Sequence, residues 1–439
     1  MKTVTAAVIG AGGRGREYAQ YALDRPGELR ITAVAEPDAI RRETFADLHG
    51  IDPAMRFDSW EALLAGPRVA DAVLICTQDR MHYDPAVKAL ELGYHVLLEK
   101  PMSNDPGECV RLGQYAERTD RVFAICHVLR YTPFFSTVKR LLDEGRIGEP
   151  VTIDLIENVG YWHQAHSFVR GSWRRADESN PMILAKSCHD LDILVWLAGA
   201  DCDTLSSFGG LRHFKAENAP PGAPYRCLDG CPVSDACPYY APDIYLNNAD
   251  KVSERILRGA ISHDTSEAGV LEALRTGPYG RCVYRCDNDV VDHQVAAMEF
   301  ANGITATFTM TAFTTDGGRT LKIMGTRGQL RAHMAKNTIE ISDFKTGRVE
   351  TIDLESTGLN HGGGDLGIMR DFTRLVRGDG GGRQPVLGGR LGAEPYDGVR
   401  RRAVEACAQD DSDSGFDRIL KRLVLNVSID GGSLRRAVL

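Results

Sequence analysis

The stretch Ala7-Val-Ile-Gly-Ala-Gly-Gly-Arg-Gly15 decides the fold of the first part of this chain. It carries an apolar run into three glycines, Gly10, Gly12 and Gly15, in the spacing G-x-G-x-x-G. Glycines at this spacing permit a tight strand-to-helix turn and let the backbone approach a pyrophosphate at the helix N-terminus. The stretch therefore predicts a strand, a dinucleotide-binding turn and a helix. A glycine-rich turn without a ligand is the alternative for so short a motif.

The next apolar run ends on an acidic residue. Glu36 follows Leu29–Ala35 and stands 21 residues after Gly15, a place where an acid accepts hydrogen bonds from the adenosine ribose. Its carboxylate would repel a 2′-phosphate, so the sequence favours NAD over NADP. Arg41 and Arg42 follow closely and are candidates to hold that phosphate, which keeps NADP as the alternative.

A second informative stretch is His95-Val-Leu-Leu-Glu-Lys-Pro-Met102, a predicted buried strand that ends on an acid, a lysine and a proline. The carboxyl ends of the strands are where ligands bind in a doubly wound sheet. A lysine there can hold a reacting hydroxyl, and its surroundings can lower its pKa. A surface salt bridge is the alternative role for Lys100. The predicted cofactor contacts are Gly10, Gly12, Gly13, Arg14, Gly15, Glu36, Glu99 and Lys100.

Short apolar runs alternate with helical patterns over about the first 125 residues. This alternation is typical of a doubly wound α/β fold, in which helices cover both faces of a parallel sheet. The runs interpreted as strands are Thr5–Ile9, Leu29–Ala35, Ala72–Cys76, His95–Leu98 and Val122–Cys126.

The later part of the chain has a different pattern. Val295–Phe300 and Ile304–Thr311 flank Asn302-Gly303, a two-residue hairpin signal, and further strand-like runs follow without helices between them. Such an order predicts antiparallel pairing. Met182–Leu197 is predicted to be one helix. We divide the chain into a first domain at 1–127, a second at 128–390 with a cysteine-rich insert at about 222–290, and an irregular tail at 391–439.

Composition limits the class of protein. The 439 residues are 43% hydrophobic and 26% charged, with a formal net charge of −8. These values are ordinary for a globular protein and favour neither nucleic acid nor an anionic membrane as a partner. No run approaches the roughly 20 apolar residues of a membrane span, and Val4–Ile9 is too short for a signal peptide. We therefore expect a cytoplasmic protein.

Three motifs together resemble the glucose–fructose oxidoreductase, inositol dehydrogenase and MocA family. They are Gly10–Gly15, Glu99-Lys100-Pro101 and His189-Asp-Leu-Asp192, and the resemblance runs from about residue 4 to about residue 377. It implies a Rossmann domain, followed by an α+β domain built on a large open, mostly antiparallel sheet. It also implies a nicotinamide cofactor and a sugar-like or cyclitol-like substrate. We expect a homo-oligomer, either a dimer or a tetramer.

Three residues are candidates for catalysis. Lys100 would orient the reacting hydroxyl, and His189 would accept its proton because imidazole titrates near neutral pH. Asp192 lies one turn after His189 and would orient it or the substrate. One departure from the inositol dehydrogenase-like pattern weakens this proton relay: Ala185 stands where an aspartate is expected, and the adjacent Lys186 offers a second cation.

Aromatic and arginine side chains are candidates for the substrate pocket. Aromatic rings suit the apolar faces of sugars, and arginines suit carboxylates, sulfonates or phosphates. Packing or surface charge is the alternative for each of them. The predicted residues are Arg130, Tyr131, Tyr161, Trp162, Arg170, Trp173 and Arg174.

Five of the eleven cysteines gather in the insert. They are Cys227, Cys231, Cys237, Cys282 and Cys286. Four thiolates would suit a structural zinc, and the Cys-Pro pairs also suit an iron–sulfur cluster, although the spacing is not C-x2-C. Buried free thiols or one reversible disulfide are the alternatives.

Three functions remain open at this point. The first is oxidation of a ring hydroxyl of a sugar, sugar derivative or cyclitol by NAD. The second is cleavage of a glycoside, in which NAD oxidises a hydroxyl transiently so that the leaving group departs by elimination. The third is a dinucleotide-binding protein without catalysis.

Overall fold

A computed structural model describes residues 2–247, 252–315, 317–357 and 360–379 of the chain. Contacts divide it into two compact units. The first contains 1–140, 202–204 and the described residues from 354 onward, and the second contains 141–201 and 205–353. Each unit is described by itself below. The predicted tail at 391–439 lies outside the described residues.

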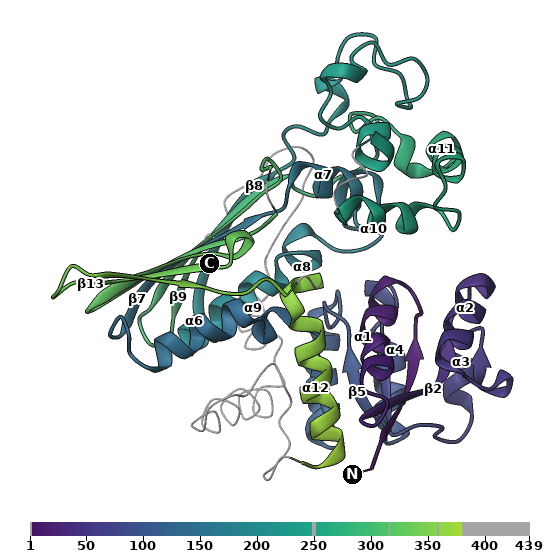
Figure 1. Ribbon diagram of the computed structural model, residues 1–439, viewed down its shortest axis with the longest axis horizontal. Coiled ribbons are helices and arrows are strands. Elements are labelled where there is room, and N and C mark those ends of the chain that lie inside the picture. The colour runs from purple at the N-terminus through teal and green to yellow at the C-terminus, as the bar shows by residue number, and fades with distance from the viewer. Residues whose placement is uncertain (1, 248–251, 316, 358–359, 380–439) are drawn as a thin grey trace, which may run out of the picture. The chain divides into compact units, whose positions relative to one another are not determined.

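The first unit is built on a six-stranded parallel sheet in the order β3-β2-β1-β4-β5-β6 (Figure 1). Its strands are β1 (Val4–Ile9), β2 (Leu29–Ala35), β3 (Arg56–Phe57), β4 (Ala72–Ile75), β5 (His95–Leu98) and β6 (Phe123–Ile125). Every residue of β4 and β5 is buried, as expected for strands covered on both faces. The five predicted strands are confirmed within a residue or two, and β3 was not predicted.

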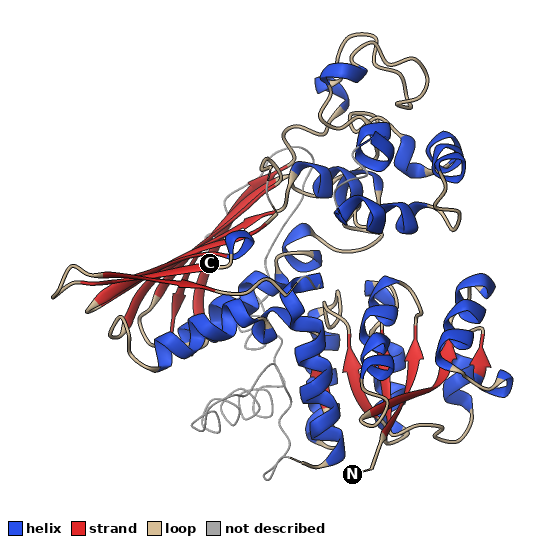
Figure 2. Ribbon diagram, viewed as in Figure 1, coloured by secondary structure: helices blue, strands red, loops and turns tan. Residues whose placement is uncertain are grey.

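Helices cover both faces of this sheet (Figure 2). Neighbouring residues of β1 enter different cores, since Val8 packs with helices α1, α2 and α12, whereas Ala7 and Ile9 pack with α3, α4 and α5. The helices are α1 (Gly13–Asp24), α2 (Ala39–His49), α3 (Trp60–Ala65), α4 (Tyr83–Glu91), α5 (Pro106–Glu117) and α12 (Gly364–Arg377). Helix α12 thus reaches this unit from far along the chain. Helix α6 (Pro133–Asp143) follows the short 3-10 helix η3 (Val128–Tyr131).

The second unit contains an eight-stranded sheet in the order β14-β13-β12-β11-β7-β10-β9-β8. From β14 to β9 the pairing is antiparallel apart from β7 with β10, which is parallel. Its strands are β7 (Pro150–Asn158), β8 (Cys202–Gly210), β9 (His293–Phe300), β10 (Thr305–Thr311), β11 (Gly318–Gly325), β12 (Gly328–His333), β13 (Thr338–Asp343) and β14 (Val349–Asp353). The predicted hairpin at Asn302-Gly303 is confirmed, and Gly303 has the positive φ of 83° that favours glycine. The mostly antiparallel sheet is confirmed as well.

The predicted helix at Met182–Leu197 is wrong in one respect. The structure has two helices, α8 (Met182–Ala185) and α9 (Cys188–Ala198). The Lys186 N–H still bonds to the Met182 carbonyl, whereas the Ser187 carbonyl accepts the N–H groups of Asp190 and Leu191 and so begins a new helix. The break places Lys186 and Ser187 in the corner between two helices. Helix α9 packs against β7 and β10.

A long excursion joins β8 to β9 and contains the cysteine-rich insert. It includes α10 (Val252–Ile261) and α11 (Glu267–Thr276), neither of which was predicted. The segment after β7 contains α7 (Tyr161–His163) and the π-helix η4 (Gln164–Arg170). Ala165 and Val169 of η4 share an apolar cluster with the insert. Across the described parts of the chain, every helix is too short or too polar to cross a membrane.

Candidate functional site

The glycine loop between β1 and α1 has the geometry that a bound pyrophosphate requires. Gly10 has a φ of +91°, and a Cβ there would lie 2.5 Å from the Cys76 carbonyl oxygen. A Cβ on Gly15 would lie 2.1 Å from the Gly10 carbonyl oxygen, so both positions exclude any side chain. By contrast, a Cβ on Gly12 or Gly13 would meet nothing within 4 Å. The loop is therefore closely packed behind and open in front, as a dinucleotide needs.

Glu36 lies beside this loop. Its buried carboxylate accepts the Ala11 N–H at 2.9 Å and the Asp38 N–H at 3.1 Å, so it fixes the loop as well as facing it. Arg41 lies 3.7 Å from the same carboxylate. Arg42 instead donates to the Glu36 carbonyl at 2.8 Å and pairs with Glu43. Of the two arginines considered for a 2′-phosphate, Arg42 is therefore already committed to protein partners.

Arg14 and Glu99, both predicted to contact the cofactor, are partners of each other. Arg14 Nε donates to Glu99 Oε1 at 2.7 Å, and Nη2 bonds to Asp365 at 2.5 Å. The Tyr18 hydroxyl also donates to Glu99, at 2.7 Å. Burial alone would raise the pKa of Glu99, but the Arg14 guanidinium and Lys100 hold that pKa below its usual range. This network, which we call the Arg14 network, joins the glycine loop to the end of β5 and to α12.

Lys100 stands directly after β5, where the sequence predicted it. Its N–H donates to Glu99 Oε2 at 2.8 Å. The buried His82 holds the next residue, because its two ring nitrogens lie 2.6 Å from the Pro101 carbonyl and 3.2 Å from the Thr77 carbonyl. The glycine loop and the ends of β4 and β5 therefore gather at one edge of the sheet. Neither His82 nor Asp365 was predicted, because each acts through a contact that no local motif marks.

The remaining prediction in the first unit concerns Arg130 and Tyr131, which lie in η3. Tyr131 packs against α12, since a Cβ on Gly367 would lie 2.8 Å from the Tyr131 Cβ. Burial raises the pKa of its hydroxyl. The structure thus gives Tyr131 a packing role within this unit. Arg130 is half-buried beside it.

In the second unit, His189 and Lys186 flank a buried set of charges. Asp190 accepts two hydrogen bonds from Arg319, at 2.8 and 3.2 Å. Arg319 also lies 2.5 Å from Glu157, and the Lys186 ammonium lies 3.2 Å from the other oxygen of Glu157. His189 itself is buried, and Asp192 is half-buried one turn farther along α9. We call Glu157, Lys186, Asp190 and Arg319 the buried charge network.

Glu157 and Arg319 were not predicted, although the sequence carries a signal for them. Glu157 falls in register with the buried Ile153 and Leu155 of β7. Arg319 falls in register with the buried Leu321 of β11 and directly faces Glu157 across the two strands. A charged residue in the inward phase of a strand needs a partner. Burial raises the pKa of Glu157, against the opposing effect of Arg319 and Lys186.

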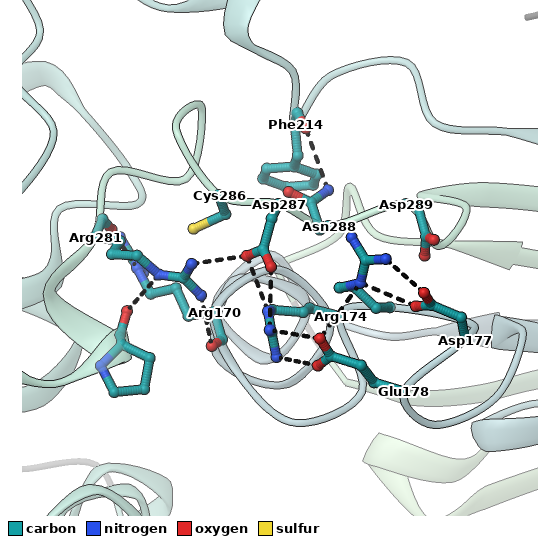
Figure 3. A network of polar contacts seen from close by, with 12 residues as sticks. Arg170, Arg174, Asp177, Glu178, Phe214, Arg281, Cys286, Asp287, Asn288 and Asp289 are labelled. Atoms are coloured by element: carbon teal, nitrogen blue, oxygen red, sulfur yellow. Dashed lines mark hydrogen bonds and ion pairs between the residues drawn. The ribbon is translucent and has the colours of Figure 1, made fainter.

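The predicted pocket residues of the second unit lie along α7, η4 and the segment after them. Trp162 stacks on His163, Tyr161 contacts Tyr239, and Trp173 contacts Phe168. Arg170 is only 1% exposed and donates to the carbonyls of Arg281 and Tyr239, each at 2.7 Å. Arg174 pairs with Asp287 and Glu178, as Figure 3 shows. Arg170 is therefore an interior residue, whereas Arg174 is half-buried.

The structure does not support the predicted zinc site. Within the described ranges, no group of three or more His, Cys, Asp or Glu side chains has the arrangement of a metal site. Four of the cysteines, Cys227, Cys231, Cys237 and Cys282, line a cavity of only about 10 Å³, and all five are free. Two physical reasons explain the outcome.

The first reason is that a cation already occupies this region: Arg170 Nη2 donates to the Cys227 sulfur at 3.7 Å. The second is that burial raises the pKa values of Cys237, Cys282 and Cys286, which favours neutral thiols over thiolate ligands. The Cys286 thiol donates to the Cys282 carbonyl at 3.4 Å. Both observations weigh against a thiolate metal site among these cysteines.

Comparison with known proteins agrees with the fold and with the loop. Residues 139–378 match the family model described as the oxidoreductase family, C-terminal alpha/beta domain. Residues 4–127 match the model described as the oxidoreductase family, NAD-binding Rossmann fold.

Individual relatives are distant. YteT of Bacillus subtilis, named as an oxidoreductase, is 24% identical over 78% of this chain and 81% of its own. Inositol 2-dehydrogenase of Corynebacterium glutamicum is 27% identical over 45% of this chain and 55% of its own. A solved structure of levoglucosan dehydrogenase with NADH and levoglucosan has a TM-score of 0.62 at 15% identity, over 86% of this chain and 91% of that one, and shows the shared fold. The chain belongs to the Gfo/Idh/MocA oxidoreductase family, with an NAD-binding Rossmann domain and a C-terminal α/β domain.

Proposed function

We propose that this enzyme transfers a hydride between NAD and a ring hydroxyl of a sugar, sugar derivative or cyclitol. The observation that carries the proposal is the edge of the first unit's sheet. There an open glycine loop, the Glu36 carboxylate and Lys100 come together. The names of the relatives support the substrate class, because inositol and levoglucosan are both polyhydroxylated rings.

The residues of the loop fit NAD. Gly12 and Gly13 leave room in front of the loop, and α1 offers its N-terminal N–H groups to a pyrophosphate. The Glu36 carboxylate has lone pairs beyond the two that its backbone donors use, and these can accept ribose hydroxyls. When bound, NAD supplies the hydride acceptor of the reaction.

The chain's own residues would orient the reacting hydroxyl and accept its proton. We assign to Lys100 the orientation of the reacting hydroxyl, because an ammonium donates to an alcohol oxygen and stabilises negative charge there. We assign to His189 the acceptance of the proton, and to Asp192 the orientation of His189 or of the substrate. Because Ala185 carries no carboxylate, Lys186, held by Glu157, is the charged group that this chain offers at that corner.

The experiment that tests this proposal is a substrate panel of cyclitols, aldoses, uronates and aryl glycosides. Each reaction is scored for NADH and for released aglycone. NADH formation on a ring alcohol without release of an aglycone supports the proposal. Aglycone release with no net NADH would assign the chain to the redox-cycled cleavage reaction instead. Binding of NAD without turnover of any compound would favour the non-catalytic alternative. The homo-oligomer and the cytoplasmic location stay predictions.

A further inference from the structure

A cavity of about 540 Å³ lies in the second unit, between the segment after η4, the cysteine-rich insert and the end of α11. The charged residues that line it are four arginines, Arg170, Arg174, Arg226 and Arg281. No acidic residue is among the described residues of its wall. A wall of this composition is selective for negative charge.

Two of these arginines have no carboxylate partner within the described part of the chain. Arg170 is buried and bonds to two carbonyls and a thiol, all of them neutral acceptors. Arg226 donates to the carbonyls of Leu274, Thr276 and Gly277 at 2.8 to 3.0 Å. These carbonyls belong to the last turn of α11 and its C-cap. The Arg226 guanidinium therefore interacts favourably with the negative C-terminal end of the α11 dipole. A buried guanidinium such as Arg170 is costly when no anion compensates it.

The other two arginines share their carboxylates. Arg174 and Arg281 both bond to Asp287, at 2.9 and 2.7 Å, and Arg174 also pairs with Glu178 at 2.9 Å (Figure 3). Hydrogen bonds from Arg174 and Arg281 hold the pKa of Asp287 well below its usual range. Four guanidinium groups are thus matched by two carboxylates, and the wall keeps an excess of positive charge.

The cavity also has the size and the aromatic surface of a binding site for a small molecule. Its volume falls within the range of about 300–1,000 Å³ that ligand pockets show. Tyr279, on its wall, stacks on His166 with ring centroids 4.8 Å apart, so its ring is held rigidly. Ser172 adds an exposed hydroxyl to the same wall. A rigid ring beside guanidinium groups suits a small ring compound that carries an anionic substituent.

We propose that this cavity binds a small organic oxyanion, a sugar carrying a phosphate or carboxylate group. The excess of guanidinium groups recognises the oxyanion, and Tyr279 and Ser172 contact the body of the ligand. The proposal concerns binding by the second unit alone. The test of this binding proposal therefore does not depend on whether the enzyme transfers a hydride.

Calorimetric titration of the full chain without NAD tests it, with glucose 6-phosphate and glucuronate as probes and glucose as the neutral control. We expect at least one anionic probe to bind, with an affinity that falls as salt is added, and no binding of glucose under the same conditions. Absence of binding by both anionic probes, or equal binding of glucose, would overturn the proposal.

A matched pair of variants locates the site. Ser172→Asp places a negative charge on the exposed wall and should weaken binding by at least about tenfold, whereas Ser172→Asn should stay within about threefold of wild type. Because Ser172 is exposed, both variants should fold, which circular dichroism checks. Equal affinities for the two variants would place the bound anion elsewhere and contradict the proposal.

A second pair separates the cavity from general surface charge. Arg174→Gln should weaken binding, whereas Arg175→Gln should not, because Arg175 lies one residue away, pairs with Asp177 and is not on the cavity wall. Equal losses in both variants would show a nonspecific charge effect and would also count against the site.

Discussion

Glu36 is the side chain on which we expect the choice between NAD and NADP to depend. Its carboxylate lies beside the open glycine loop, and the Arg41 guanidinium lies 3.7 Å from it and 3.8 Å from Asp38. We expect wild type to bind NAD at least about tenfold tighter than NADP, a difference of about 1.4 kcal/mol. Glu36→Gln should narrow that ratio, because the amide keeps an acceptor for the Ala11 N–H and removes the repulsion.

Calorimetric titration with both dinucleotides measures the ratio. Arg42→Gln is the matched control, since Arg42 is engaged with the Glu36 carbonyl and Glu43 and should leave the ratio unchanged. Equal or inverted affinities in wild type would contradict the prediction. They would make Arg41 the contact for a 2′-phosphate.

Lys100 is the residue on which the proposed chemistry depends in the first unit. Lys100→Met should remove most turnover while NAD affinity stays nearly unchanged, because the lysine would serve the hydroxyl and not the adenosine end. His189→Ala should reduce turnover by about 10²–10⁴ if the imidazole is a general base. Lys88→Met, an exposed change on α4, is the control. Near-wild-type rates in both site variants would show that the catalytic assignment is wrong.

His95 gives the first unit a dependence on pH. It is buried in β5, and its Nδ1 accepts the Val122 N–H at 2.9 Å, which requires a neutral ring nitrogen. Burial, then Arg121 and Arg68, lower its pKa to about 4. Since the unfolded chain takes up this proton near pH 6.5 and the folded chain only near pH 4, the stabilisation is present above pH 6.5 and is lost as pH falls through that window.

We expect this group to remove roughly 2 kcal/mol from the free energy of unfolding between pH 7 and pH 4.5. Urea titrations at both pH values measure the loss, and His95→Gln should make it smaller, because the amide does not titrate. An identical loss in the variant would assign the acid sensitivity to other groups.

At this scale, local motifs were predictable and distant partners were not. Gly10, Gly15, Glu36 and Lys100 lie where the sequence predicted them, because each is defined by a short spacing after a strand. Asp365 joins Arg14 from 351 residues away, and nothing near either residue marks the pair. The zinc prediction failed for a similar reason, since Arg170 enters the cysteine region from an earlier segment.

At the scale of the elements, the predictable ones were those with a strong apolar pattern. Buried parallel strands are continuous apolar runs, and five of the first unit's strands were predicted on that basis. Strand β3 has two residues, and β14 has mostly exposed ones, so neither carries such a pattern. The break between α8 and α9 has no glycine or proline to mark it.

The buried charge network holds α9 to the sheet of the second unit. Arg319 in β11 is the common partner of Asp190 and Glu157. Arg319→Met should lower the free energy of unfolding by about 3–5 kcal/mol, because it leaves buried carboxylates without that partner. Lys186→Met should cost less, since Glu157 keeps Arg319. Urea unfolding of both variants measures which one loses more free energy of unfolding.

Adding Glu157→Gln to Arg319→Met is the control for that explanation. The double variant should recover part of the lost stability, because it removes one uncompensated charge. If Lys186→Met proves as costly as Arg319→Met, Arg319 is not the centre of the network.

At the scale of the whole molecule, the sequence order does not match the compact units. Helix α12 follows the entire second unit in the sequence, yet it packs in the core of the first with β1 and α1. Its amphipathic pattern alone could not show which unit it joins. Asp365 in its first turn, bonded to Arg14 in the first turn of α1, supplies the polar part of that attachment.

This attachment predicts that NAD binding slows hydrogen exchange in α12. A ligand at 100 times its dissociation constant stabilises the unit that binds it by about 2.7 kcal/mol. Because the Arg14 network joins the glycine loop to α12, hydrogen exchange should slow in α1 and α12 when NAD is added. Exchange should not change in β12–β14, which belong to the second unit.

The variant Asp365→Ala tests the role of the Arg14 network. In this variant, the protection that NAD gives α1 should persist, while the protection that NAD gives α12 should fall. Mass spectrometry of exchanged peptides measures both, and equal protection of α12 in wild type and variant would show that apolar packing of α12, not the Arg14 network, carries the coupling.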